Sequence, residues 1–245
     1  MCQVCACRVL HRGKVMDDTF APPARRRLTD EAYDLIKNDI ILCTLKPGAE
    51  VTEAGLAAHY KLGLAPIRSA LSRLSQDGLV HTIPRRGYVI APVNAKNANE
   101  VFEMRLLLEP AAARAAAGRV DEQQLLKLGG GPFLKNNAPD DLQFLRNNRD
   151  FHVAIARASG NERMTRVIES LLDEMQRLLH IGLFSSRDHK RLQFDHQHQR
   201  RQHEELITAL VSGDTDAAEA AALKHVQHSR ELVMRAIGDI LAVSL

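Results

Sequence analysis

The sequence contains no tryptophan, and aromatic residues supply only 4% of its 245 positions. Aromatic residues are enriched in strands, so their scarcity beside a hydrophobic content of 45% favours aliphatic packing of helices over a sheet sandwich. The chain also lacks an apolar run of the roughly 18 residues that a membrane span needs, and a basic segment followed by an apolar one at its start. We therefore expect a mainly helical, cytoplasmic protein that does not enter a membrane.

An excess of charge of either sign is also missing, because the formal net charge is only +3. Residues 1–92 hold 13 Lys and Arg against 9 Asp and Glu, so the small basic excess lies at the front. Since this surplus is modest, the placement of the basic residues has to carry any argument for nucleic-acid binding. The length exceeds a typical domain of about 150 residues, so two domains are expected.

Three cysteines and a histidine gather near the N-terminus, at Cys2, Cys5, Cys7 and His11. Four such side chains are in principle able to bind zinc. The segment is short and its surroundings carry no pattern of an ordered element, so we favour a disordered tail over residues 1–27.

Residues 28–92 carry the pattern of three helices followed by a hairpin. Thr29 and Thr52 are suitable N-caps for the first two helices, and Pro66 suits the start of the third. Two short β-prone runs joined by a Pro-Arg-Arg-Gly turn follow, at 79–83 and 88–91. This order of elements predicts a winged helix-turn-helix domain.

The third predicted helix has one apolar and one polar face. Its apolar stripe repeats at i, i+3, i+4 and i+7 and comprises Ile67, Ala70, Leu71 and Leu74. The opposite face carries side chains that bond base edges or phosphates, namely Arg68, Ser69, Ser72, Arg73 and Gln76. An ordinary solvated face would look the same, so this helix alone leaves both interpretations open. Arg85 and Arg86, followed by Gly87, favour DNA binding because they place two cations at the tip of the wing.

The remainder of the chain is predicted to be entirely helical. Residues 93–99 are polar and asparagine-rich, which suits a linker between domains. Helices are expected near 99–118, 121–128, 139–159, 161–183, 187–212 and 215–242. We assign residues 100–245 to an antiparallel all-α helical bundle, in which ligand sites are built from side chains on facing helices.

Histidines in this predicted bundle form a candidate metal site. Asn148 and His152 lie four residues apart, so their side chains share one helix face. His203 and His225 fall in the last two helices, and facing helices of a bundle can bring them to His152. Such a set suits zinc, nickel, cobalt or manganese. The chain has eleven histidines, so a wet polar face is the competing interpretation, and the surface is expected to hold His180, His189, His196, His198 and His228.

Arg105 and Glu109 lie one turn apart on an apolar helix, where a buried arginine needs an anionic partner. An internal ion pair and a clamp for the carboxylate of a ligand are equally open.

These motifs together resemble the GntR-type bacterial regulators of the FadR-like branch, which carry an FCD ligand-binding domain. The resemblance rests on the order and spacing of Leu45-Lys46-Pro47-Gly48, Leu56-Ala57, Pro66-Ile67-Arg68, Ala70-Leu71, Asp77-Gly78-Leu79-Val80 and Pro84-Arg85-Arg86-Gly87. Gly63-Leu64 departs from the Ser-Arg that usually opens the recognition helix in this family, so one expected arginine contact to DNA is absent.

In the second half, three segments are similar to the metal-binding pattern of FCD domains: Asn148-x-x-Phe151-His152, His203-x-x-Leu206-Ile207, and Gly213-Asp214 leading to His225. The resemblance implies a divalent transition metal (zinc, nickel or manganese) bound by Asn148, His152, His203 and His225. It also favours the clamp role for Arg105. The family commonly has Asp where Asn148 stands, and a neutral amide is a weaker donor, so a lower metal affinity is expected.

We therefore expect a homodimeric, ligand-responsive transcriptional regulator that binds double-stranded operator DNA. It would repress a metabolic operon and respond to a small organic acid. A metal-dependent hydrolase is the alternative, because three His ligands with an open position also form hydrolytic zinc sites. Spacing places no general base near the cluster, so we assign no catalytic residue and expect no enzyme. A third interpretation, a winged helix that binds protein, is disfavoured by the two wing-tip arginines.

Overall fold

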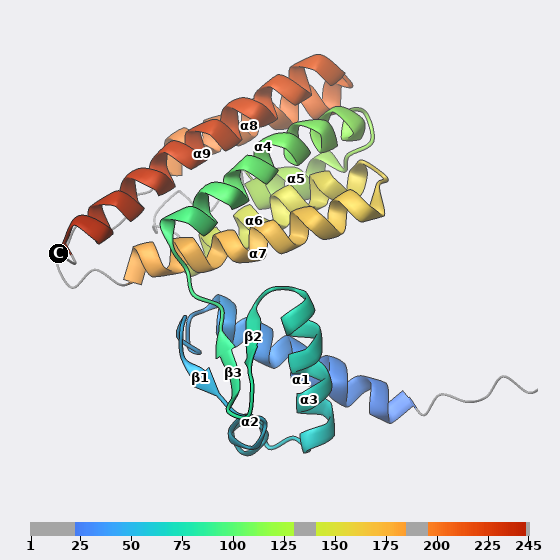
Figure 1. The fold of residues 1–245 in the computed structure, drawn as a ribbon. Helices are drawn as coiled ribbons and strands as arrows, with labels where there is room; N and C mark the ends of the chain where they lie inside the picture. Colours follow the sequence, from blue (N-terminus) through green and yellow to red (C-terminus); the bar gives the residue numbers. More distant parts are fainter. Residues whose placement is uncertain (1–22, 130–140, 185–195, 244–245) are drawn as a thin grey trace, which may run out of the picture.

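The computed structural model describes residues 23–129, 141–184 and 196–243. They form a small winged-helix head and a larger helical bundle that lies against it (Figure 1). The mainly helical fold class expected from the sequence is confirmed. The N-terminal cysteines and His11 lie outside the described residues.

The head combines helices with a small antiparallel sheet. Its elements are α1 (Pro23–Ile41), β1 (Glu50–Val51), α2 (Glu53–Tyr60), α3 (Leu64–Gln76), β2 (Val80–Ile83) and β3 (Gly87–Ile90). The strand order is β1-β3-β2, and the β2–β3 hairpin is the predicted wing. Aliphatic side chains of α1, α3 and the sheet form one core that includes Ile36, Ile40, Ile67, Leu71, Leu74 and Ile90. The predicted winged helix-turn-helix is confirmed.

Some details of the head differ from the sequence expectation. α1 begins at Pro23 and not at Thr29, so residues 23–27 of the predicted tail are helical. Proline suits a first helical turn, and the alanine and arginines after it are good helix formers. Pro66 is the third residue of α3, because Gly63 is the N-cap. The sequence did not predict β1, because a strand of two residues is too short to show alternation of apolar and polar residues.

The bundle contains α4 (Ala95–Ala116), α5 (Glu122–Gly129), α6 (Asp141–Ala158), α7 (Glu162–Phe184), α8 (His196–Ser212) and α9 (Thr215–Val243). The predicted linker 93–99 is too long, because the side chain of Asn94 accepts a hydrogen bond from the backbone N–H of Asn97 at 2.9 Å and starts α4 there. The helix expected at 187–212 is described only from His196, since residues 185–195 lie outside the described ranges.

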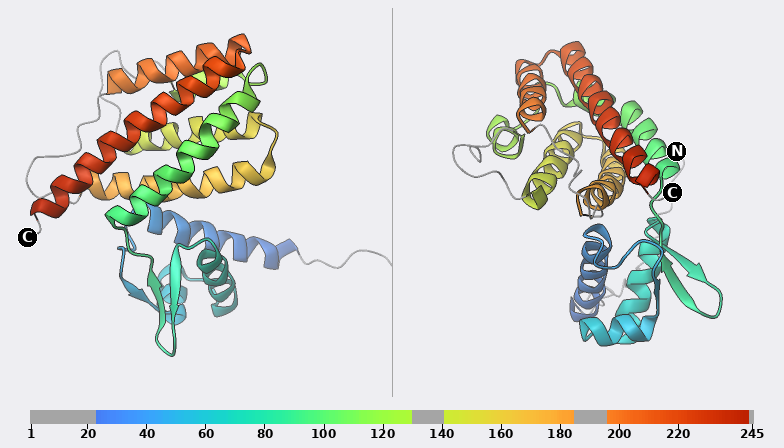
Figure 2. Two further views of the ribbon diagram at one scale, coloured as in Figure 1. Left: turned by 45° about the horizontal axis from the view of Figure 1, so that its top comes forward. Right: turned by 90° about the vertical axis from the view of Figure 1, so that its left-hand side faces the viewer.

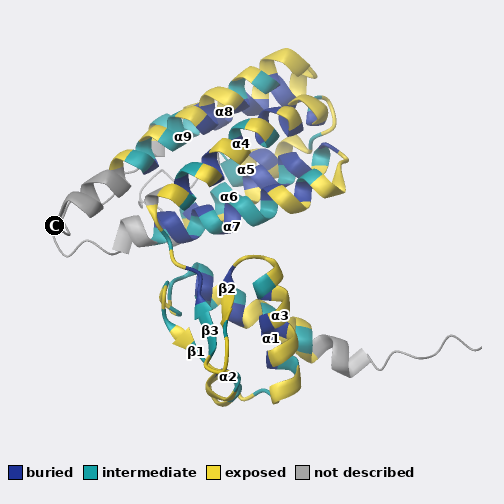
Figure 3. Cartoon of the chain, viewed as in Figure 1, coloured by how far each residue is buried: buried dark blue, intermediate teal, exposed yellow. Residues whose placement is uncertain are grey.

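α4 packs most extensively on the long α9 and also contacts α6 and α7. Both views in Figure 2 show α4 running beside α9. Buried side chains face the spaces between the helices, and exposed ones cover the outside (Figure 3). None of the described helices is long and apolar enough to cross a membrane.

The head is fixed to the bundle along α7. Lys37 Nζ on α1 lies 2.6 Å from Oδ2 of the buried Asp173 on α7, and the two groups form an ion pair. The other oxygen of Asp173 accepts from Nε of Arg149 on α6 at 2.6 Å. One turn along α7, Nη2 of the buried Arg177 donates to the backbone carbonyl of Ala91, directly after β3, at 2.5 Å. α7 therefore connects the head with the bundle helix that carries Asn148 and His152.

Candidate DNA-binding face and histidine centre

The two faces of α3 have the predicted burial. Ile67, Ala70, Leu71 and Leu74 are buried. The exposed side consists of Arg68, Ser69, Ser72, Arg73 and Gln76. Packing of the apolar stripe against α1 therefore turns a continuous polar face of α3 to solvent.

Two arginines on this face already have acidic partners. Arg68 donates through Nε and Nη2 to Oε2 of Glu53, at 3.0 and 2.8 Å. This hydrogen bond lowers the pKa of Glu53. Arg73 Nη1 donates to Asp30 at 2.7 Å, and its guanidinium lies 4.1 Å from the ring centre of Tyr33. Sequence spacing did not indicate these contacts, because the partners come from other helices.

The wing presents its two arginines to solvent. Arg85 and Arg86 are exposed in the turn between β2 and β3, and Arg85 has a φ of +65°. Gly87 has a φ of +122°, and a Cβ at this position would lie 2.6 Å from the carbonyl oxygen of Val51. Only glycine fits there, so Gly87 shapes the hairpin that carries the two cations.

Three predicted histidines meet inside the bundle. His152 of α6, His203 of α8 and His225 of α9 have relative exposures of only 2–4%. Each offers a ring nitrogen within 4.8 Å of those of the others. Nε2 of His152 and Nε2 of His225 are 3.1 Å apart. Side chains that are distant in sequence are thus brought to one buried point.

The Nδ1 atoms of all three rings face acceptors. His152 Nδ1 lies 2.8 Å from Oε2 of Glu109, His203 Nδ1 lies 3.2 Å from the carbonyl oxygen of Gly129, and His225 Nδ1 lies 3.1 Å from Oε1 of Gln202. An acceptor at Nδ1 favours the tautomer with its proton there and a lone pair on Nε2. His203 Nε2 is buried and has no hydrogen-bond partner. This arrangement, with lone pairs turned inward, suits a divalent transition metal.

Burial and neighbouring charges favour the neutral forms of His203 and His225 and the charged form of Glu109. Burial, and then the neighbouring His152, lower the pKa of His203 to about 3. Burial and the adjacent rings also lower the pKa of His225 well below its usual value. Burial alone would raise the pKa of Glu109, but Arg105 and His152 outweigh it and lower that pKa to about 2. Neutral imidazoles are the form that binds metal.

Glu109 contacts both Arg105 and His152, of which only the contact with Arg105 was considered from the sequence. Its Oε1 accepts from Nε of Arg105 at 2.5 Å, which is the internal pair considered above, while Oε2 reaches His152. Sequence spacing indicated the first contact but not the second, because α4 and α6 approach only in the folded bundle. Glu109 is bound on both oxygens, so it is not a free general base.

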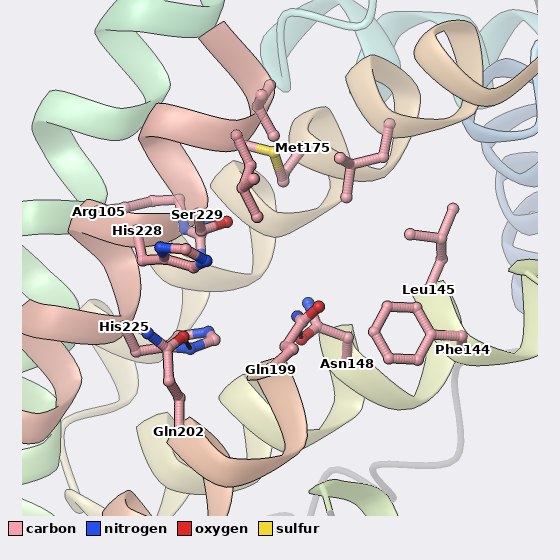
Figure 4. Close-up of a pocket in the computed structure, with 13 residues that line it drawn as sticks. Arg105, Phe144, Leu145, Asn148, Met175, Gln199, Gln202, His225, His228 and Ser229 are labelled. Carbon is pink, nitrogen blue, oxygen red and sulfur yellow. Dashed lines mark hydrogen bonds between the residues drawn. The ribbon is translucent and has the colours of Figure 1, made fainter. Parts of the chain in front are cut away.

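Asn148, Arg105 and His225 line one pocket between the bundle helices (Figure 4). Asn148 Oδ1 accepts a hydrogen bond from Nε2 of Gln199 at 2.8 Å. His228, expected on the surface, is half-buried in the wall of this pocket, and its ring lies 4.3 Å from that of His198. Neither histidine is an isolated surface residue.

The winged-helix head is a DNA-binding architecture, and the helical bundle forms a second domain with a pocket of its own. Two family models match the chain: bacterial regulatory proteins, gntR family, over residues 28–90, and the FCD domain over residues 100–228. The protein belongs to the GntR family of transcriptional regulators, with an FCD domain following the DNA-binding domain. The family resemblance expected from the sequence is confirmed.

Individual relatives agree with this assignment. YdhC of Bacillus subtilis, an uncharacterized HTH-type transcriptional regulator, is 27% identical over 205 residues, which cover 81% of this chain and 88% of the relative. The transcriptional repressor RspR of Escherichia coli is 24% identical and covers 84% of this chain and 89% of its own length. The solved structure of E. coli McbR/YncC shares the fold, with a TM-score of 0.68 at 23% identity over 85% of this chain and 97% of its own. The chain is a regulator and not an enzyme, and the hydrolase alternative has no support.

Proposed function

We propose that this regulator represses a metabolic operon and releases its operator when a small organic acid binds in the bundle pocket. The observation that carries the proposal is the buried Arg105, which lines the pocket beside the histidine centre. A guanidinium held in an enclosed site is a recognition element for a carboxylate, because it offers parallel N–H donors.

In this proposal α3 reads the bases of the DNA, and the wing contacts the DNA backbone. Arg68, Ser69, Ser72 and Arg73 would meet base edges or phosphates in the major groove. Arg85 and Arg86, on the hairpin shaped by Gly87, would meet phosphates or the minor groove. Exposure of all these side chains supports the assignment.

We further propose that His152, His203 and His225, with Asn148 as a weaker oxygen ligand, bind one zinc, nickel or manganese ion. The orphaned Nε2 of His203 supports this set. A bound dication would supply positive charge for an effector carboxylate. Glu109, Gly129 and Gln202 would hold the three rings in place through Nδ1.

A homodimer is part of the proposal, because two heads would read the two halves of a symmetric operator. α4 exposes large apolar side chains on the face opposite the pocket helices, with Leu107 69% and Met104 41% exposed. Such a surface favours burial against a second copy.

The proposal is tested by an electrophoretic shift titration with duplex DNA from the region upstream of the protein's own gene. The full chain should bind this DNA specifically. A matched protein with Arg105→Gln, once circular dichroism has shown it to be folded, should still bind the DNA but lose its response to organic acids. If acids act equally on both proteins, Arg105 is not the clamp.

A further inference from the structure

Resting on the proposed effector pocket, we infer that the effector is a monocarboxylic acid with an apolar body, and not a dicarboxylic, tricarboxylic or sugar acid. The inference comes from the division of the pocket wall into a polar end and an apolar end (Figure 4).

The polar end is formed by Arg105, Asn148, Gln199, Gln202, His225, His228 and Ser229. In Figure 4, Arg105 and His225 lie together on one side of the cavity. The Nε of Arg105 is already bound to Glu109, which leaves the end of the guanidinium for a ligand. A carboxylate fits this end because its two oxygens match two parallel N–H donors.

The apolar end is formed by Phe144, Leu145, Met175, Leu179, Leu232 and Val233. Figure 4 shows Phe144 and Leu145 across the cavity from Arg105, and Met175 at its upper edge. Leu145, Met175, Leu179 and Val233 are buried, so this wall belongs to the bundle core. A ring or short alkyl chain would bury apolar surface here.

The composition of the apolar end excludes the other acid classes. Arg105, and a dication bound by the histidines, would both lie at the polar end with the first carboxylate. A second carboxylate would lie against leucine, methionine or phenylalanine without a partner, and hydroxyl groups would lose their hydrogen bonds to water there.

Isothermal titration of the full chain with a panel of acids tests the inference. Benzoate and hexanoate should bind at least tenfold more tightly than succinate, citrate, gluconate or acetate. Arg105→Gln should abolish binding of hexanoate. Phe144→Asn, at a half-buried wall position, should weaken hexanoate at least fivefold but leave acetate unchanged, whereas the control Val167→Asn outside the pocket should change neither.

The inference is overturned if succinate, citrate or gluconate binds as tightly as hexanoate, or if hexanoate does not bind at all. DNA shifts with the same acids separate it from the proposed function. If hexanoate binds but leaves DNA affinity unchanged, the ligand class stands and the proposed regulation is wrong. If citrate alone releases the DNA, the proposed regulation stands and the ligand class is wrong.

Discussion

In the winged-helix head, the arginines of α3 and of the wing lie at the surface, whereas Arg105 and Arg177 of the bundle are buried. Among the residues that the structure describes, every buried polar or charged side chain belongs to the bundle. The head thus has an apolar core and a polar outside, while the bundle holds ionisable groups inside. Buried charges require partners, and exposed ones remain free to meet a new partner. The surface of the head is therefore suited to bind a large polyanion, and the interior of the bundle is suited to enclose a small ligand.

The largest expected effect is loss of the buried partner of Arg105. Glu109→Gln should destabilise the protein by about 3–5 kcal/mol, because it leaves a buried guanidinium uncompensated. The measurement is urea unfolding followed by circular dichroism. The matched control is Glu53→Gln, which also removes a carboxylate from an arginine but at the surface of the head, and it should barely move the midpoint. If Glu109→Gln and Glu53→Gln lower the stability equally, the buried pair of the bundle is no more important for stability than the surface pair of the head.

The sequence predicted the exposed face of α3 better than the buried contacts between helices. The faces of α3 follow from helical periodicity, because Ile67 and Leu71 fix which side Arg68 occupies. The contact of Glu109 with His152 joins α4 to α6, and that of Lys37 with Asp173 joins α1 to α7. Such contacts depend on how helices pack, and no local spacing encodes them.

Metal binding should stabilise the bundle next most strongly. At a free zinc concentration about 100 times the Kd, the gain is about 2.7 kcal/mol. Calorimetric melting with zinc and with a chelator should show a reversible rise in Tm. His152→Ala should abolish it, Asn148→Asp should enlarge it through an anionic oxygen, and the control His81→Ala, exposed on β2 of the head, should keep it. If zinc still raises the Tm of His152→Ala, the metal binds at another site.

The junction between the two regions should have a smaller but measurable effect. Asp173→Asn removes the charge that Lys37 and Arg149 share, with an expected cost of about 2 kcal/mol. Hydrogen exchange should show faster exchange of the α1 amides that face α7. Asp150→Asn is the matched control, since the exposed Asp150 also contacts Arg149, with Nη1 at 3.2 Å. Unchanged exchange in Asp173→Asn would mean that Arg177 alone holds the head.

The wing should contribute the smallest effect, one that varies with salt. Arg85→Asn combined with Arg86→Ala should reduce the slope of log affinity against log salt by about one for each phosphate that the protein no longer neutralises. Asparagine is chosen at position 85 because it tolerates the positive φ found there. A slope equal to that of the wild type would leave the wing as a structural hairpin.

We expect the outer face of the head to read DNA and the inside of the bundle to sense a ligand. Two affinities, measured for the full chain and for Arg68→Ala, test this division: one for an operator that the wild type selects from random duplex DNA, the other for zinc. Arg68→Ala should remain folded, keep its zinc affinity and lose operator affinity by roughly ten- to a hundredfold. A folded Arg68→Ala protein that holds the operator as tightly as wild type would contradict it.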